Sequence, residues 1–273
     1  MQVYRFNPNK RNFLQSLSVT TWLIIINVFM FFIGLSLIAS FGESFFSNHL
    51  AIKPSMIFTG LSLWTFLTSM FFHANFFHLF ANMFSLFFVG RFLEKLIGRK
   101  RFFGVYMISG IIGGLFFVLA GLTYNNPAVP AVGASGALFG LVGVLAILVP
   151  RTKIYLIAGP LVLLLLEFLF VPIVPETFGV ILSLIINVLF FVMIFAMFSF
   201  GTNFQKFALP VELPMWLLPI IAIVPLVLVD FIAGIDLPIG NSAHFGGLVV
   251  GFIYGFYLKK KFLNKIRRIV IIF

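Results

Sequence analysis

Ser135 and His244 are the two residues of this 273-residue chain whose types and positions most clearly indicate chemistry. Ser135 lies in the run GASGALFG and His244 in AHFGGLVVG, each within an apolar segment long enough to cross a bilayer. A serine hydroxyl is a weak nucleophile until an adjacent base takes its proton, and histidine is suited to that task. Because polar groups at membrane depth are costly, the pair suggests hydrolytic chemistry inside a membrane.

The composition is that of a membrane protein. Hydrophobic residues make up 62% of the chain and charged residues only 9%, with a mean hydropathy of +1.17. Soluble domains carry roughly a quarter charged residues, so we expect a protein that crosses the bilayer several times. The net charge of +11 is therefore interpreted by its position along the chain, and no nucleic-acid partner is expected.

The sequence predicts no metal and no cofactor. It contains no cysteine, which excludes disulfides, thiol nucleophiles and cysteine metal ligands. The histidines at 73, 78 and 244 are too few to form a metal site without neighbouring carboxylates. The chemistry is therefore expected to rest on protein side chains alone.

Uncharged runs and chain breakers predict an all-α polytopic membrane protein with eight helices that cross the bilayer. A helix needs about 20 apolar residues to cross the hydrocarbon core. A turn at 125–127 splits one long uncharged run, and prolines at 172 and 175 split another. The expected spans are 20–40, 71–92, 102–123, 132–150, 154–172, 178–200, 213–233 and 238–258.

The distribution of basic residues predicts the orientation of these spans. With the N-terminus in the cytoplasm, 17 of the 18 lysines and arginines fall on the cytoplasmic side, and only Lys53 lies outside. Segment 1–19 and the basic tail 259–273 are then both cytoplasmic. The chain starts without an Arg- and Ser-rich targeting segment, so we expect a prokaryotic plasma membrane.

This topology places five polar residues at one depth on the outer side. Ser135 and His244 each lie near the outer end of a span, and His73, His78 and Asn82 begin another. His78 and Asn82 are four residues apart and share one helix face. His73 lies five residues before His78, roughly 140° away around the helix, so we expect it to point elsewhere.

Glycines predict close contact between the serine and histidine helices. His244, Gly247 and Gly251 form one stripe, and Gly136 begins a second stripe beside Ser135. Glycines at four-residue spacing allow helices to approach closely. Such an approach brings Ser135 and His244 within the ~3 Å that nucleophilic catalysis requires.

Simpler interpretations exist for each feature taken alone. A serine in a membrane helix usually bonds the carbonyl four residues earlier, and glycine stripes usually serve packing. Glu94 with Lys95 and Arg99 is typical of a charge cluster at a cytoplasmic helix end. Glu167 and Asp230 are candidates for proton relay or for local pairing. The combination of serine, histidine and glycine stripes favours a reaction site.

The combined pattern resembles the rhomboid family of intramembrane serine proteases. The matching motifs are His73-x4-His78-x3-Asn82, Gly133-x-Ser135-Gly136 and Ala243-His244-x2-Gly247-x3-Gly251. Trp64 and the Gly90-Arg91-x2-Glu94 stretch also resemble family positions. The resemblance covers roughly residues 55–150 and 238–258, and it implies a protease domain over 20–258.

The resemblance implies a role for each motif residue. Ser135 is the expected nucleophile and His244 the general base, in a dyad without an acidic third member. His78 and Asn82 are expected to hold the oxyanion together with the Ser135 backbone amide. Gly133 is expected to let the chain bend around that oxyanion hole.

Four features qualify this assignment. His73 is expected to be structural. Phe139 replaces a frequent tyrosine, and we expect it to stack on His244. Asp230 or Asp236 is an alternative third member that would orient the imidazole. The family core has six helices, so two additional spans are expected within 154–233. The helices of Ser135 and His244 are then separated by three spans instead of one. Because both numbers are odd, the two residues remain on the outer side.

The resemblance predicts cleavage of single-span membrane proteins near the outer end of their transmembrane segments. Such substrates are expected to carry helix-weakening residues near the scissile bond. One alternative is an inactive relative that binds membrane clients, since a fold does not guarantee its chemistry. A transporter that uses Glu167, Asn187 and Asp230 as a polar pathway is the second alternative.

Overall fold

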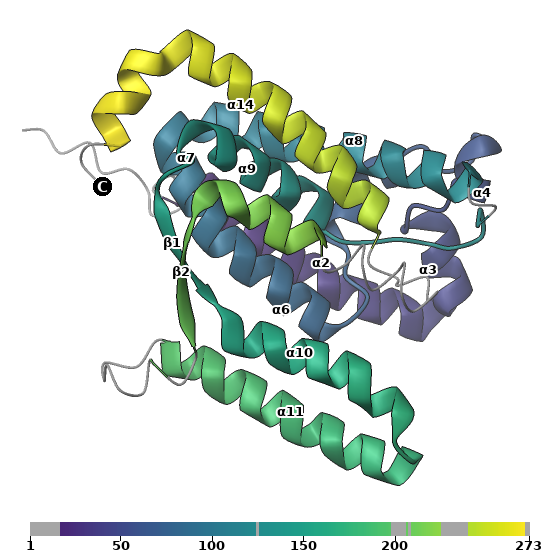
Figure 1. Ribbon diagram of the computed structural model, residues 1–273. Helices are drawn as coiled ribbons and strands as arrows, with labels where there is room; N and C mark the ends of the chain where they lie inside the picture. The colour runs from purple at the N-terminus through teal and green to yellow at the C-terminus, as the bar shows by residue number, and fades with distance from the viewer. Residues whose placement is uncertain (1–16, 124–125, 198–205, 207–208, 225–239, 271–273) are drawn as a thin grey trace, which may run out of the picture. The chain divides into compact units, whose positions relative to one another are not determined.

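The computed structural model describes residues 17–123, 126–197, 206, 209–224 and 240–270. Its elements are almost all helical, which confirms the all-α membrane fold (Figure 1). Each of the eight expected spans contains a helix within these residues. Four described helices are long and apolar enough to cross a membrane: Val19–Phe41, Phe76–Ile97, Arg99–Thr123 and Glu176–Ala196. The full number of crossings stays a prediction.

The chain divides into two compact units, residues 1–150 with 216–273 and residues 151–215. The first unit holds every residue of the expected reaction site. Its main helices are α2 (Val19–Phe41), α6 (Phe76–Ser85), α7 (Arg91–Ile97), α8 (Arg99–Thr123), α9 (Ser135–Leu148) and α14 (Asn241–Val270). Shorter elements precede or join them: α3 (Glu43–His49), α4 (Pro54–Phe58), α5 (Thr65–Thr68), η1 (Ser69–Phe71) and the π-helical turn η2 (Leu86–Gly90).

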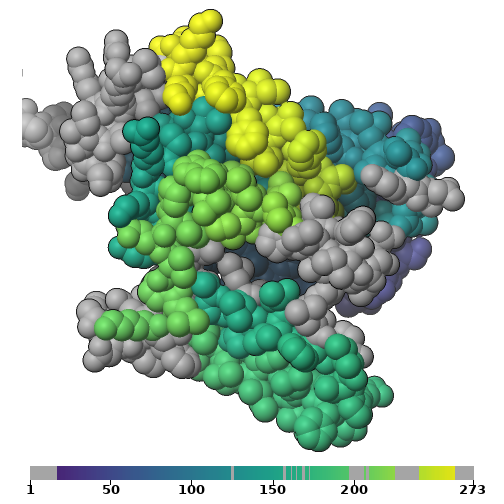
Figure 2. All heavy atoms as spheres, in the orientation of Figure 1, coloured from purple at the N-terminus to yellow at the C-terminus, as the bar shows by residue number. Residues whose placement is uncertain are grey.

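Helix α9 forms the core of the first unit. Eleven of its fourteen residues are buried, and it packs against both α8 and α14. In the space-filling view the side chains of α14 lie directly on the helices beneath them (Figure 2). A helix that is apolar on every side is suited to this central position.

The second expected span begins later than the sequence predicted. Residues 72–75 are not helical, and α6 starts at Phe76 because the Asn75 side chain accepts a hydrogen bond from the backbone N–H of His78. An asparagine cap satisfies a donor that a helix start would otherwise leave unpaired. The prediction of a helix from residue 71 was therefore wrong by about one turn.

Glu94 has a more specific role than the charge cluster predicted for it. It is only 7% exposed, and its carboxylate accepts hydrogen bonds at 2.8 Å from the backbone amides of both Val19 and Thr20. The Thr20 hydroxyl donates a third bond at 2.7 Å. The carboxylate thus caps the positive end of α2, where negative charge is stabilising. Arg99 lies 3.8 Å from Glu94 and makes a weaker contact.

The loop between α2 and α6 contains the short helices α3 to α5. Trp64 is about half exposed, and its indole N–H donates to the carbonyl of His49 at 2.7 Å. An indole with an exposed ring and a bonded N–H suits a membrane interface. At the other end of the chain, α14 continues to Val270, so most of the expected basic tail is helical.

The second unit consists of a helical hairpin and a pair of strands. Strand β1 (Lys153–Ile157) pairs antiparallel with β2 (Pro210–Pro214), with Tyr155 opposite Glu212. Between the two strands, the chain forms helix α10 (Ala158–Phe170), the turn η3 (Val171–Ile173) and helix α11 (Glu176–Met197). The predicted helix at 154–157 was wrong, because branched and aromatic residues there favour a strand once a partner is present. The proline break before α11 is confirmed.

A partly buried polar contact joins the two helices of this hairpin. Glu167 on α10 accepts hydrogen bonds from the Ser183 hydroxyl and, at 2.9 Å, from the Asn187 side-chain amide. Asn187 also bonds the Ser183 carbonyl and hydroxyl. Of the two interpretations left open for Glu167, the structure shows the local pairing. Asp230 lies outside the described residues.

The end of the second unit leads into a short helical stretch. A 3-10 turn, η4 (Met215–Leu217), follows β2, and helix continues to residue 224. This stretch covers the first half of the seventh expected span, and the remainder of that span lies outside the described residues.

Candidate active site

Ser135 and His244 are hydrogen-bonded to each other although 109 positions separate them in sequence. The distance from His244 Nε2 to Ser135 Oγ is 2.8 Å. Ser135 is the first residue of α9, and His244 lies in the first turn of α14. Direct contact between a hydroxyl and an imidazole nitrogen is the geometry in which a histidine can take the serine proton.

The two helices meet backbone to backbone, as the glycine stripes predicted. A Cβ added to Gly247 would lie 1.9 Å from the Gly136 carbonyl oxygen, and one added to Gly251 would lie 2.2 Å from that of Gly140. No side chain fits at either position. The absence of Cβ atoms therefore sets the helix separation that brings Ser135 to His244.

Phe139 holds the imidazole from one side. Its ring stacks on the His244 ring with centroids 4.3 Å apart and planes 18° from parallel, which confirms the predicted contact. His244 is only 3% exposed, and none of the described residues bonds its Nδ1 atom. Asp230 and Asp236, the alternative orienting acids, lie outside the described residues.

Gly133 brings the backbone before α9 against His78. Its φ of +135° is a backbone conformation that glycine adopts readily and other residues rarely do. A Cβ added there would lie 2.7 Å from His78 Cε1 and 3.8 Å from Ser135 Oγ. The Gly133 N–H donates to the Ser69 carbonyl at 2.8 Å, which fixes this bend. The histidine ring, the bend and the serine hydroxyl therefore lie together.

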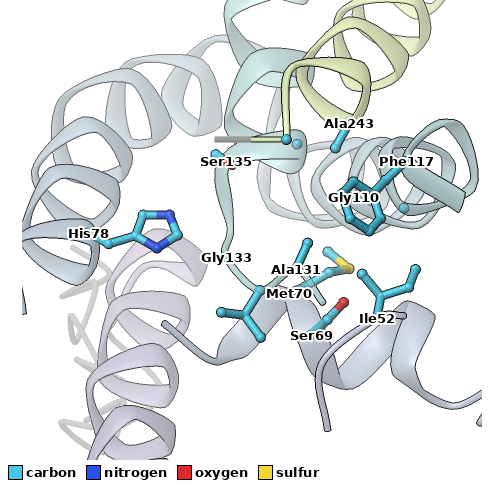
Figure 3. Close-up of a pocket in the computed structure, with 14 residues that line it drawn as sticks. Ile52, Ser69, Met70, His78, Gly110, Phe117, Ala131, Gly133, Ser135 and Ala243 are labelled. Atoms are coloured by element: carbon cyan, nitrogen blue, oxygen red, sulfur yellow. The ribbon is translucent and has the colours of Figure 1, made fainter. Parts of the chain in front are cut away.

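A small cavity lies between these residues. It has a volume of about 50 Å³ and is lined by His78, Gly133, Ser135 and Ala243, with Ser69 and Met70 on its opposite wall. Figure 3 shows His78 entering from α6 and Ser135 from the start of α9. A water molecule needs roughly 10–15 Å³ of such space, so the cavity accommodates a few waters.

Asn82 is placed one turn beyond His78, on the same face as predicted. It is 4% exposed, and its side-chain amide donates to the His78 carbonyl at 2.8 Å. It does not line the cavity in this conformation. Its contact is therefore with the backbone that carries His78 rather than with Ser135.

His73 lies closer to the site than the helical calculation predicted. Its ring packs edge-on against His78 with centroids 5.1 Å apart, and it is 5% exposed. The predicted 140° separation was wrong because α6 begins only at Phe76, so the two histidines do not share a helix. His73 buttresses the ring of His78.

Contacts made by α8 were missed in the sequence. A Cβ on Gly113 would lie 2.7 Å from the Ala243 carbonyl, and one on Gly110 would lie 2.1 Å from the Met70 side chain. The signal was present as the glycines at 110, 113 and 114. These positions make α8 a third close-packed wall beside α9 and α14.

Comparisons with known proteins find rhomboid sequences similar to part of this chain. The family profile described as the rhomboid domain matches residues 60–190. The chain is similar to "Inactive RHOMBOID-like protein 8" of Arabidopsis thaliana, with 43% identity over 67 residues. It is also similar to "RHOMBOID-like protein 1" of the same plant, with 42% identity over 65 residues.

Both matches are partial. Each covers 24% of this chain, and they span 18% and 17% of the two plant proteins. The profile nevertheless includes the serine motif, Gly133 to Gly136, whereas His244 lies beyond the matched residues. Residues 60–190 of this chain therefore carry a rhomboid domain.

Proposed function

We propose that this protein is an intramembrane serine endopeptidase that cleaves transmembrane segments of membrane proteins. The observation that carries the proposal is the 2.8 Å contact between His244 Nε2 and Ser135 Oγ in a buried setting. A serine paired in this way gains the base that it needs to attack a carbonyl carbon. Ser135 is the nucleophile, and His244 accepts its proton and later donates it to the leaving amine.

The start of α9 supplies donors for the developing oxyanion. The first backbone N–H groups of a helix have no carbonyl partner within the helix, and they lie at its positive end. Ser135 occupies that position, and the His78 ring lies across Gly133 from it. We assign the Ser135 amide, His78 and Asn82 to the oxyanion hole, where one oriented donor contributes about 3–4 kcal/mol to the transition state.

Asn82 does not line the cavity, so it reaches the oxyanion only if its side chain moves when substrate binds. In a substrate-free enzyme, catalytic hydrogen bonds are often incomplete and form only when substrate binds. The proposal therefore assigns Asn82 a rotamer change on substrate binding, whereas His78 already lines the cavity.

The size of the cavity limits the substrates. About 50 Å³ accommodates water but not a helix, so a substrate must present an unwound segment. Glycine or proline near the scissile bond lowers the free energy of unwinding by about 1–3 kcal/mol per residue. We therefore propose single-span proteins with helix-weakening residues as the substrate class, cleaved at the outer end of the span.

The placement in the membrane is part of the proposal. The two termini and most basic residues lie on the cytoplasmic side of a prokaryotic plasma membrane, and the Ser135 site lies near the opposite surface. Water reaches the site from that surface to hydrolyse the acyl-enzyme.

A fluorophosphonate probe tests the reactive serine directly. The purified full-length protein is expected to be labelled, whereas Ser135→Ala and His244→Ala are expected to lose labelling. Ser36→Ala is the matched control, because the exposed Ser36 hydroxyl donates to the Phe32 carbonyl one turn earlier in α2. Cleavage of a reconstituted single-span protein by wild type but not by Ser135→Ala completes the test.

The second candidate is a client-binding protein without protease activity. It is favoured by one observation, the word "Inactive" in the name of one plant relative. Folded wild-type protein that is not labelled and does not cleave, yet retains a single-span protein on purification, would support this candidate over the protease.

A further inference from the structure

A second hollow lies between α8 and α14, away from the candidate active site. It has a volume of about 650 Å³, within the range of small-molecule sites. Helices α8 and α14 run side by side at this place (Figure 1). Tyr254 lines the hollow ten residues after His244, which is about 15 Å along the helix. We call this hollow the α8–α14 groove.

One end of the α8–α14 groove is basic. Lys100 and Arg101 line it from the first turn of α8, and Tyr254 faces them from α14. Arg101 and Lys261 both act electrostatically on the Tyr254 hydroxyl. Lys261 also donates to the Tyr257 hydroxyl at 2.9 Å. Three cations and two phenols thus converge on one end, which is suited to an anion with several oxygen atoms.

The other end of the groove is apolar and open. Ile108 lines this end from α8, and Ile253 lines the groove beside Tyr254 on α14; the two side chains are 55% and 67% exposed. Gly104 lies between the two ends, and a Cβ added there meets no atom within 4 Å. The groove therefore leads from the charged end along an uncovered strip of α8 and α14.

We propose that the α8–α14 groove binds an anionic phospholipid. The phosphate lies among Lys100, Arg101 and Lys261, and one acyl chain follows the groove past Gly104 to Ile108. Basic hollows between transmembrane helices on the cytoplasmic side bind acidic head groups, and the charge pattern predicts that side for both helix ends here. A soluble anion would use only the basic end, whereas a lipid uses both.

Lipid titration followed by native mass spectrometry tests the proposal. Delipidated full-length Ser135→Ala protein is titrated with phosphatidylglycerol, phosphatidylcholine, glycerophosphoglycerol and inorganic phosphate. We expect phosphatidylglycerol to bind at least tenfold more tightly than phosphatidylcholine, and the two chain-free anions not to bind measurably. Equal binding of the two lipids, or binding of phosphate alone as tight as that of the lipid, would overturn the proposal.

Two sets of variants locate the lipid. Lys100→Gln with Arg101→Gln is expected to weaken phosphatidylglycerol binding about thirtyfold, since each basic residue near the surface contributes about 1 kcal/mol. Arg151→Gln with Lys153→Gln removes the same charge from exposed positions outside the groove and is expected to change binding less than twofold.

The apolar end has its own variant. An added Cβ at Gly104 meets no atom within 4 Å, and the longer side chain of Gly104→Leu is expected to occupy the groove and weaken phosphatidylglycerol binding at least tenfold, while Gly104→Ala leaves binding near the wild-type value. Full lipid binding by folded Gly104→Leu protein would show that no acyl chain occupies the groove. Thermal unfolding of each variant verifies its fold.

Discussion

The α9–α14 contact and the α10–α11 hairpin hold pairs of helices together in different ways. In the first, glycines let backbone meet backbone, with no room for a Cβ at Gly247 or Gly251. In the second, large side chains point outward, with Phe178 at 69% exposure, and a carboxylate bonds two polar side chains across the pair. The first contact fixes the helix spacing, and the second links two helices whose surfaces are otherwise suited to lipid.

This difference explains why the candidate site lies at the α9–α14 contact. A 2.8 Å contact between side chains on two helices survives only if the helices cannot shift by an ångström. Steric contact between backbones provides that rigidity, because a shift meets repulsion at once. Hydrogen bonds between membrane helices contribute only about 0.6 kcal/mol each on average, so the hairpin is the more adaptable region.

Gly247→Ala should break the core contact and give the largest effect. The new methyl group would lie 1.9 Å from a backbone oxygen that no rotamer change can move. We expect a loss of about 3 kcal/mol or more in the free energy of unfolding, together with loss of fluorophosphonate labelling. Thermal unfolding in detergent and the labelling assay measure the two effects.

The matched control for this prediction is Gly104→Ala. This glycine also lies within a helix of the first unit, but its added methyl group meets nothing within 4 Å. Replacement of a helical glycine by alanine there is expected to leave stability unchanged or raise it by about 0.5–1 kcal/mol. Equal effects of the two substitutions would disprove the steric account of the α9–α14 contact.

Gly133→Ala should disturb the site more than the fold. The residue has a φ of +135°, and its methyl group would push the His78 ring from its position. If His78 holds the oxyanion, labelling and cleavage rates should fall about 10²- to 10³-fold, the usual cost of a lost oxyanion donor. The rates are measured on protein whose unfolding temperature is determined in parallel.

Gly42→Ala separates backbone strain from the loss of the site. Gly42 also has a positive φ, of 83°, but nothing lies within 4 Å of an added Cβ. Gly42→Ala and Gly133→Ala are each expected to lose about 1–2 kcal/mol of stability through backbone strain at positive φ. Only Gly133→Ala should lose activity. Activity retained in Gly133→Ala would remove His78 from the proposed oxyanion hole.

Glu94→Ala should release the start of α2. The substitution leaves the amides of Val19 and Thr20 without their acceptor in a buried place. Buried donors that lose a charged partner cost about 1–3 kcal/mol, so we expect a decrease of that size in unfolding free energy. Glu43→Ala, at an exposed helix start, is the control and should cost a few tenths of a kcal/mol. Similar losses in both would show that the buried cap contributes little.

The sequence predicted the core contact better than the local structure around it. The spacing of Gly247 and Gly251 requires close approach wherever the helices lie, and the Phe139 ring reaches His244 by simple helix geometry. These inferences depend on the missing Cβ atoms of the glycines and on the size of the Phe139 ring. They hold even where the ends of helices are misplaced by a turn.

The errors arose where a capping residue or a distant partner decides the structure. The Asn75 cap delays α6, and this single shift brings His73 beside His78. The strand at 153–157 forms because residues 210–214 pair with it from more than fifty positions away. A local hydropathy pattern contains neither fact. The cap of α2 by Glu94 joins residues 74 positions apart and was likewise not apparent.

Apart from the controls, Glu167→Ala should have the smallest effect on stability of the substitutions considered. The substitution removes the acceptor of both Ser183 and Asn187, and hydrogen bonds between membrane helices contribute about 0.6 kcal/mol on average and 1.7 at most. We expect a decrease of that size in the stability of the second unit, measured by limited proteolysis. Labelling of Ser135 should stay within twofold of wild type, because the serine contact depends on the glycines of another unit.

The conservative variant Glu167→Gln keeps an acceptor oxygen and should lose less than Glu167→Ala. If both variants abolish labelling while the fold remains, the hairpin governs the Ser135 site, and rigidity of the α9–α14 contact alone does not explain it. If only proteolysis changes, the two contacts act separately: backbone contact positions Ser135 and His244 in the first unit, and polar side chains join the two helices of the second unit.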